Sequence, residues 1–177
     1  MAFYVRKIAR AKWSLIDKSN DNIIENYRAD AIANDMRTYD DTLSFWKANS
    51  LSNEDLEPII VINSLLGDNI KKIDLLCIPE ELIEGFSLQQ MDGDTVVNEY
   101  KGLHYNIISL SIKKLVEFAG EVVLKAILLS DDHPEYIQRI PEQLQLKLVN
   151  NWIEKGKINF NDLKDSQKNN ISKYRGK

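Results

Sequence analysis

The residues best suited to chemistry gather between Arg28 and Trp46, where a predicted helix, turn and strand combine charges, hydroxyls and aromatic rings. Leu43 and Phe45 alternate with polar residues at the two-residue period of a strand, which predicts an apolar face and a polar face. The polar face can bind a polar ligand on an aromatic platform, or it can belong to an ordinary half-buried strand beside a solvated turn. The candidate ligand-binding residues are Arg37, Asp40, Asp41, Trp46 and, from a later predicted strand, His104.

The sequence has no phosphate loop, dinucleotide fingerprint, HExxH or GxSxG motif, so the better-defined enzyme classes are disfavoured. One enzyme layout remains. A first strand carries Arg6, a second carries two hydroxyls, and an acidic residue follows later. The catalytic candidates are Arg6, Thr42, Ser44 and Glu99, with Glu81 as a substitute for the last.

This order of residue types, which spans about half of the chain, resembles the mono-ADP-ribosyltransferases of the Arg-Ser-Glu type. The chain lacks the Glu-x-Glu and Ser-Thr-Ser motifs of such enzymes. The resemblance implies NAD as cofactor, with Arg6 holding a phosphate, Ser44 and Thr42 orienting the sugar, and a glutamate stabilising the developing cation. Without it, the sequence implies no cofactor.

The two histidines lie in different contexts. His104 begins a predicted strand, where it is either a hydrogen-bonded structural histidine or a catalytic base. His133 lies in the run from Asp131 to Glu135, which gathers metal-type ligands within five residues. Adjacent side chains of one loop seldom converge on an ion, so we predict a solvated loop and no metal site.

Composition predicts a folded cytoplasmic protein. Among 177 residues, 44% are hydrophobic and 28% charged, with only 7 Gly and 4 Pro. The single cysteine, Cys77, lies in an apolar run and is predicted to be a buried thiol in a reducing compartment. No window has the apolar length of a signal peptide or a membrane span, so we expect no membrane association. Abundant Ile, Asn and Lys are typical of AT-rich coding DNA and suggest a bacterium or a phage.

The net charge of −4 is unevenly distributed. Residues 1–30 have six basic and four acidic side chains, residues 31–137 have eight and nineteen, and residues 138–177 have nine and four. The basic ends can neutralise the acidic middle within one subunit, or a basic face can meet an acidic face of another molecule. A basic first strand near aromatic rings can also bind nucleic acid, but the overall acidity argues against it.

Apolar periodicity predicts the elements. Strands are expected at 3–8, 42–47, 72–78, 86–91 and 105–110, with a hairpin turn at 92–94. Helices are expected at 30–37 with Asp30 as N-cap, at 53–66, after Pro79, at 112–127 and from Pro141 to Gly156. Pro58 favours a later start for the second helix, near Glu57, and the β-branched run at 59–62 also permits a strand there. Residues 14–29 are expected to form a loop anchored by an Ile pair.

These elements predict an α+β fold, in which a small mixed or antiparallel sheet in the first two thirds is covered by C-terminal helices. Residues 1–159 form the expected single domain. Residues 160–177 form a basic helix or tail, which we expect electrostatics to hold. The sequence favours a non-enzymatic binding or regulatory module with a protein partner or self-association. The alternatives are an ADP-ribosyltransferase-like enzyme and, third, a nucleic-acid binder.

Overall fold

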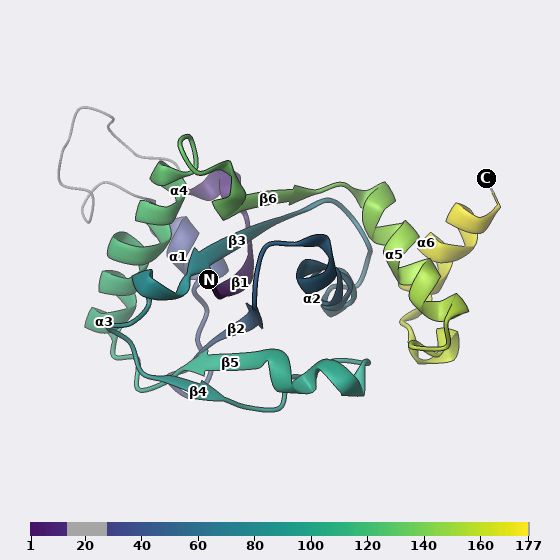
Figure 1. Ribbon diagram of the computed structural model, residues 1–177, viewed down its shortest axis with the longest axis horizontal. Coiled ribbons are helices and arrows are strands. Elements are labelled where there is room, and N and C mark those ends of the chain that lie inside the picture. Colours follow the sequence, from purple (N-terminus) through teal and green to yellow (C-terminus); the bar gives the residue numbers. More distant parts are fainter. Residues whose placement is uncertain (14–27, 177) are drawn as a thin grey trace.

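The computed structural model of the protein describes residues 1–13 and 28–176, and confirms the α+β class (Figure 1). The predicted loop at 14–29, with its Ile anchor, lies outside the described residues up to residue 27. The sheet has six strands in the order β4-β5-β2-β1-β3-β6, and every neighbouring pair is antiparallel. The strands are β1 (Phe3–Ile8), β2 (Leu43–Ala48), β3 (Ile73–Pro79), β4 (Leu88–Gln90), β5 (His104–Ile107) and β6 (Ile137–Ile140).

Helices cover both faces of this sheet. On one face lie α1 (Ala29–Asp35) and a long helical segment made of α3 (Ile112–Glu117), a π-helix, η5 (Phe118–Leu124), and α4 (Lys125–Leu129). Leu43 and Phe45 point to that face and are fully buried, as predicted. The other face packs on α2 (Asn53–Leu66). The sheet is therefore buried on both sides, which explains why β3 is a nearly continuous apolar run.

The helix α2 lies between the sheet and the C-terminal helices. Ser52 caps it by accepting a hydrogen bond from the Asp55 N–H, and the helix begins at Asn53 despite Pro58. Both the later start and the strand alternative at 59–62 were therefore wrong. The helix is apolar nearly all round because one side packs on the sheet and the other on the C-terminal helices.

The C-terminal helices are α5 (Glu142–Glu154) and α6 (Asp165–Arg175), which lie beside each other at one end of the molecule (Figure 1). Gly156, at φ +71°, follows α5 in the left-handed conformation that commonly ends a helix. In α6, Ile171 is fully buried, and the Gln167 amide donates to the carbonyls of Leu65 and Gly67 at 2.9 and 2.7 Å. Burial and the amide hydrogen bonds of Gln167 therefore hold α6 in place, in addition to electrostatic attraction.

Several ion pairs join the basic C-terminal end, residues 138–177, to the acidic middle. They are Lys164–Asp68 at 2.8 Å, Lys157–Glu99 at 2.9 Å and Arg139–Asp74 at 2.9 Å. Part of the segregated charge is thus neutralised within one subunit.

Four local expectations were wrong, each for a physical reason. The Asp30 side chain does not cap α1, whose N-cap residue is Arg28. Ser109 adopts φ +57°, so β5 ends at Ile107, before Leu110. The segment 92–94 forms no tight turn, and the connection from β4 to β5 runs through η4 (Asn98–Leu103). The edge strand β6 was not predicted, because four residues carry too little periodicity.

The thiol of Cys77 is buried on β3, as predicted, and burial raises its pKa to about 12. Within the described ranges, none of the helices combines the length and the apolarity needed to cross a bilayer.

We predict that Phe118→Ala and Trp152→Ala each lower the free energy of unfolding by about 3 to 5 kcal/mol, because both rings are almost wholly buried and their loss leaves cavities. Phe118 contacts Phe45 and Phe86 edge to face, and Trp152 stacks on Tyr100. Urea denaturation measures the change. Leu128→Ala, at a side chain that is 43% exposed, is the control and should cost far less. Equal losses in all three variants would contradict this core.

Candidate functional site

A cleft of about 330 Å³ opens where the two central strands separate. The strands β1 and β2 pair from Phe3 with Ala48 to Val5 with Trp46, and this ladder goes no further, although β1 continues beside β3 and β2 continues beside β5. We call the resulting hollow the fork cleft. Its lining residues are Arg6, Lys7, Ser44, Trp46, Asn63, Leu66, Asp94 and His104.

Arg6 holds the fork open. Its guanidinium donates from Nη1 to the Ser44 carbonyl at 2.5 Å and from Nε to the Asp35 carbonyl at 2.8 Å. It also lies over the Phe45 ring, 5.7 Å from the ring centroid. Burial lowers the pKa of Arg6 to about 10, and the nearby Asp35 carboxylate opposes this shift. The side chain remains a cation at neutral pH.

Asp35 provides the hydrogen-bond acceptor for the chain just after β1. Its carboxylate is buried and accepts hydrogen bonds from the Ala9 N–H at 2.8 Å and from the Trp13 indole at 2.7 Å. The Asn34 amide donates to its other oxygen at 2.5 Å. A buried carboxylate with several donors fixes the chain after β1 against the end of α1.

The β5 wall carries two buried polar atoms without a partner. Within the described ranges, the buried side-chain atoms that find no hydrogen-bond partner are His104 Nδ1 and Asn106 Oδ1. They lie two residues apart on one strand and so face the same side of the sheet. Native proteins leave few such atoms unsatisfied. His104 lines the cleft, whereas Asn106 is not among its lining residues.

His104 packs against Trp46 across the sheet, with the ring centroids 5.0 Å apart. Burial lowers the pKa of His104, a backbone interaction with Met91 opposes this, and the charge of Arg6 lowers it further. Trp46 is itself only 6% exposed. It therefore supports the cleft wall and is a poor open platform for a flat ligand.

Gly93 completes this wall. The backbone of the segment after β4 crosses the Trp46 ring so closely that a Cβ on Gly93 would clash with the indole and lie 2.8 Å from the His104 Cβ. The Gly93 N–H donates to the Lys101 carbonyl at 3.1 Å. The Asp-Gly signal in the sequence thus marks a close backbone approach.

The structure brings together four of the nine residues named from the sequence: Arg6, Ser44, Trp46 and His104. Asp40 and Asp41, at φ 48° and 56°, instead form the two-residue turn between Tyr39 and Thr42. The Thr42 hydroxyl donates to the Tyr39 carbonyl within that turn. Arg37 is exposed and does not line the cleft.

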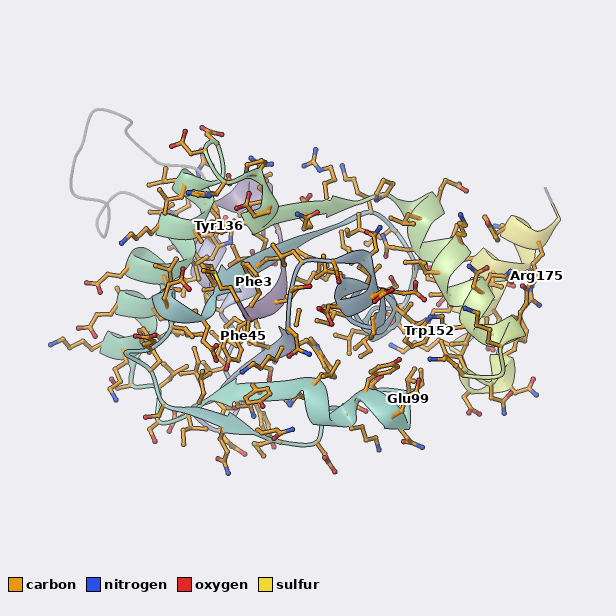
Figure 2. All side chains as sticks on the ribbon, viewed as in Figure 1. Phe3, Phe45, Glu99, Tyr136, Trp152 and Arg175 are labelled. Atoms are coloured by element: carbon orange, nitrogen blue, oxygen red, sulfur yellow. The ribbon has the colours of Figure 1, made fainter. Side chains whose placement is uncertain are left out.

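Glu99 lies elsewhere, on η4. Lys157 donates to its carboxylate at 2.9 Å, and this hydrogen bond lowers the pKa of Glu99. The same ammonium lies over the Trp152 ring, 5.0 Å from the centroid. Figure 2 shows Glu99 and Trp152 together toward α5, with Phe45 on the side toward α3. Glu81, on η3 (Glu80–Leu82), does not line the cleft either.

Four lining residues escaped the sequence analysis as site residues. Lys7 was noticed only as part of a basic run, and Asn63 is the polar interruption of an apolar helix. Leu66 and Asp94 carry no local signal, because their place depends on how α2 and the segment after β4 meet the fork. In the part of the chain that the structure describes, no three His, Cys, Asp or Glu side chains are grouped to hold a metal ion.

Comparison of the chain with protein-family models, with curated proteins and with solved structures finds no significant match. The function must therefore be argued from the fork cleft itself.

We predict that Gly93→Ala lowers the free energy of unfolding by about 1 to 3 kcal/mol, because the added methyl overpacks the Trp46 ring. Gly85→Ala is the matched control, since a Cβ there meets nothing within 4 Å. Thermal unfolding of both variants tests the close approach. It is disproved if the two glycines tolerate alanine equally.

We also predict that His104 titrates below the value of about 6.5 for a free histidine. Since the unfolded chain then binds more protons between the two pKa values, His104 contributes a loss of stability as the pH falls below about 6.5. NMR of the imidazole measures the midpoint. In urea denaturation at pH values above and below this range, His104→Gln should lose less stability on acidification than the wild type.

Proposed function

We propose that this protein is a non-enzymatic binding module that takes a small polar ligand into the fork cleft. The observation that carries the proposal is the convergence of Arg6, Ser44 and His104, which come from three different strands, on one cleft. A volume of about 330 Å³ lies within the range typical of small-molecule sites. His104, whose Nδ1 finds no hydrogen-bond partner among the described residues, is one of the lining residues.

Binding fits this cleft better than catalysis. The transferase alternative needs a glutamate near Arg6 and Ser44, and the lining carboxylate is that of Asp94, with Glu99 engaged by Lys157. Among the described residues, no hydrogen bond joins Ser44 to His104 or to another base, so Ser44 lacks the activation of a nucleophile. NAD is accordingly not required by the proposal.

The cleft and the C-terminal helices share the end of α2, which supports a ligand-gated interaction. Asn63 and Leu66, on the last turns of α2, form one wall. The same end of α2 accepts both hydrogen bonds of Gln167 on α6. A ligand that shifts this end of α2 would therefore reach α6, a candidate surface for a protein partner or self-association. The single cysteine and the composition support a cytoplasmic protein of a bacterium or a phage.

The test is a ligand screen by NMR with amino acids, sugars, nucleosides and nucleotides, NAD and ATP included, while the His104 imidazole signal is observed. We expect at least one compound to shift this signal saturably. His133, outside the cleft, is the internal reference.

A matched pair of variants locates the binding. Leu66 is 49% exposed and lines the cleft, so Leu66→Trp should fill it and weaken binding by about tenfold or more. Leu128, 43% exposed on α4, does not line it, so Leu128→Trp should bind as the wild type does. If the whole panel leaves His104 unmoved, or both variants weaken binding equally, the proposal is refuted.

A further inference from the structure

The fork cleft is lined by two cations, Arg6 and Lys7, and one carboxylate, Asp94. Within residues 1–13 and 28–176, none of the ion pairs involves Arg6 or Lys7. The two hydrogen bonds that Arg6 donates among the described residues go to backbone carbonyls, which are neutral. The Asp35 carboxylate is close enough to influence Arg6, but three other donors occupy it. Asp94, the carboxylate of the lining, is exposed to solvent.

Lys7 reinforces this charge. Burial lowers the pKa of Lys7, the charge of Lys71 lowers it further, and Asp35 opposes the shift. Two neighbouring cations in one cleft, near a third, Lys71, which precedes β3, favour a counter-ion of opposite sign. An uncompensated buried cation is costly, and a bound anion removes that cost.

The hydrogen-bonding groups left over have the right chemistry. A guanidinium has five N–H donors in a planar fork, and the described contacts of Arg6 use one on Nε and one on Nη1. The remaining donors match the paired oxygens of a carboxylate or a phosphate.

We infer that the ligand of the fork cleft is a small metabolite with an oxyanion group, a carboxylate or a phosphate, that binds to Arg6 and Lys7. The inference rests on the proposed function and specifies its ligand class. The cleft volume limits the ligand to a small molecule, and the exposed side of Leu66 offers an apolar contact for its uncharged part.

The experiment titrates the full chain with inorganic phosphate, with succinate, and with sodium chloride at matched ionic strength, and follows the His104 imidazole signal by NMR. At about 20 mM, a site with a Kd of about 1 mM is nearly full. We expect phosphate or succinate to shift His104 saturably, while chloride does not. The response to each of the two probes shows which oxyanion the site prefers.

Variants separate a site from general screening. Lys7→Gln should weaken oxyanion binding by about three- to tenfold, since it removes one charge-assisted contact at an exposed side chain. Lys113→Gln, at a side chain that is 86% exposed on α3, should bind within about twofold of the wild type. Arg6→Lys keeps a cation but not the planar donors, so it should weaken binding more than Lys7→Gln does. Its thermal midpoint shows whether it folds.

The outcomes are distinguishable. If both oxyanions leave His104 unmoved while an uncharged compound of the screen shifts it, the oxyanion inference fails and the binding module stands. If neither class of compound shifts it, both fail. Equal weakening by Lys7→Gln and Lys113→Gln would mean screening of the whole surface, and would also overturn the inference.

Discussion

The separation of the two central strands is the constraint on which the rest of this structure depends. Antiparallel strands normally satisfy each other's backbone groups, and every group that leaves the ladder in a buried place needs a substitute partner. Here the Ser44 carbonyl accepts a hydrogen bond from the Arg6 guanidinium, and the Ala9 N–H donates one to the Asp35 carboxylate. The Arg6 guanidinium and the Asp35 carboxylate thus replace missing hydrogen bonds of the ladder. The hollow between the separated strands is the fork cleft.

That structural task does not account for everything at Arg6. Filling the fork requires two N–H donors, which a neutral amide also supplies. The chain nevertheless places a full positive charge there, and none of the ion pairs within residues 1–13 and 28–176 involves Arg6. Burying such a charge costs several kcal/mol before compensation. Because the backbone carbonyls need only hydrogen-bond donors, the positive charge of Arg6 is the physical reason to connect this residue with a ligand as well as with the fold.

The sequence predicted the helices and strands better than the contacts between them. Two-residue alternation was sufficient for the core positions Leu43 and Phe45 because burial repeats along a strand. It also identified Arg6, Ser44, Trp46 and His104 by their types. It could not show that Arg37 points to solvent. The turn at Asp40 and Asp41 was predicted, but its two positive φ angles were not. Cleft residues such as Leu66 depend on contacts between elements remote in sequence.

The helix α2 explains why the cleft is largely preformed. It is buried on one side by the sheet and on the other by α5 and α6, so its last turns can shift only together with two apolar clusters. Arg6 and the strands fix the opposite side through hydrogen bonds to backbone atoms. The wall formed by the segment after β4 is the least buried, although Gly93 of that segment packs closely against the Trp46 ring. A ligand that binds here therefore orders few groups, and little of its interaction free energy is lost to entropy.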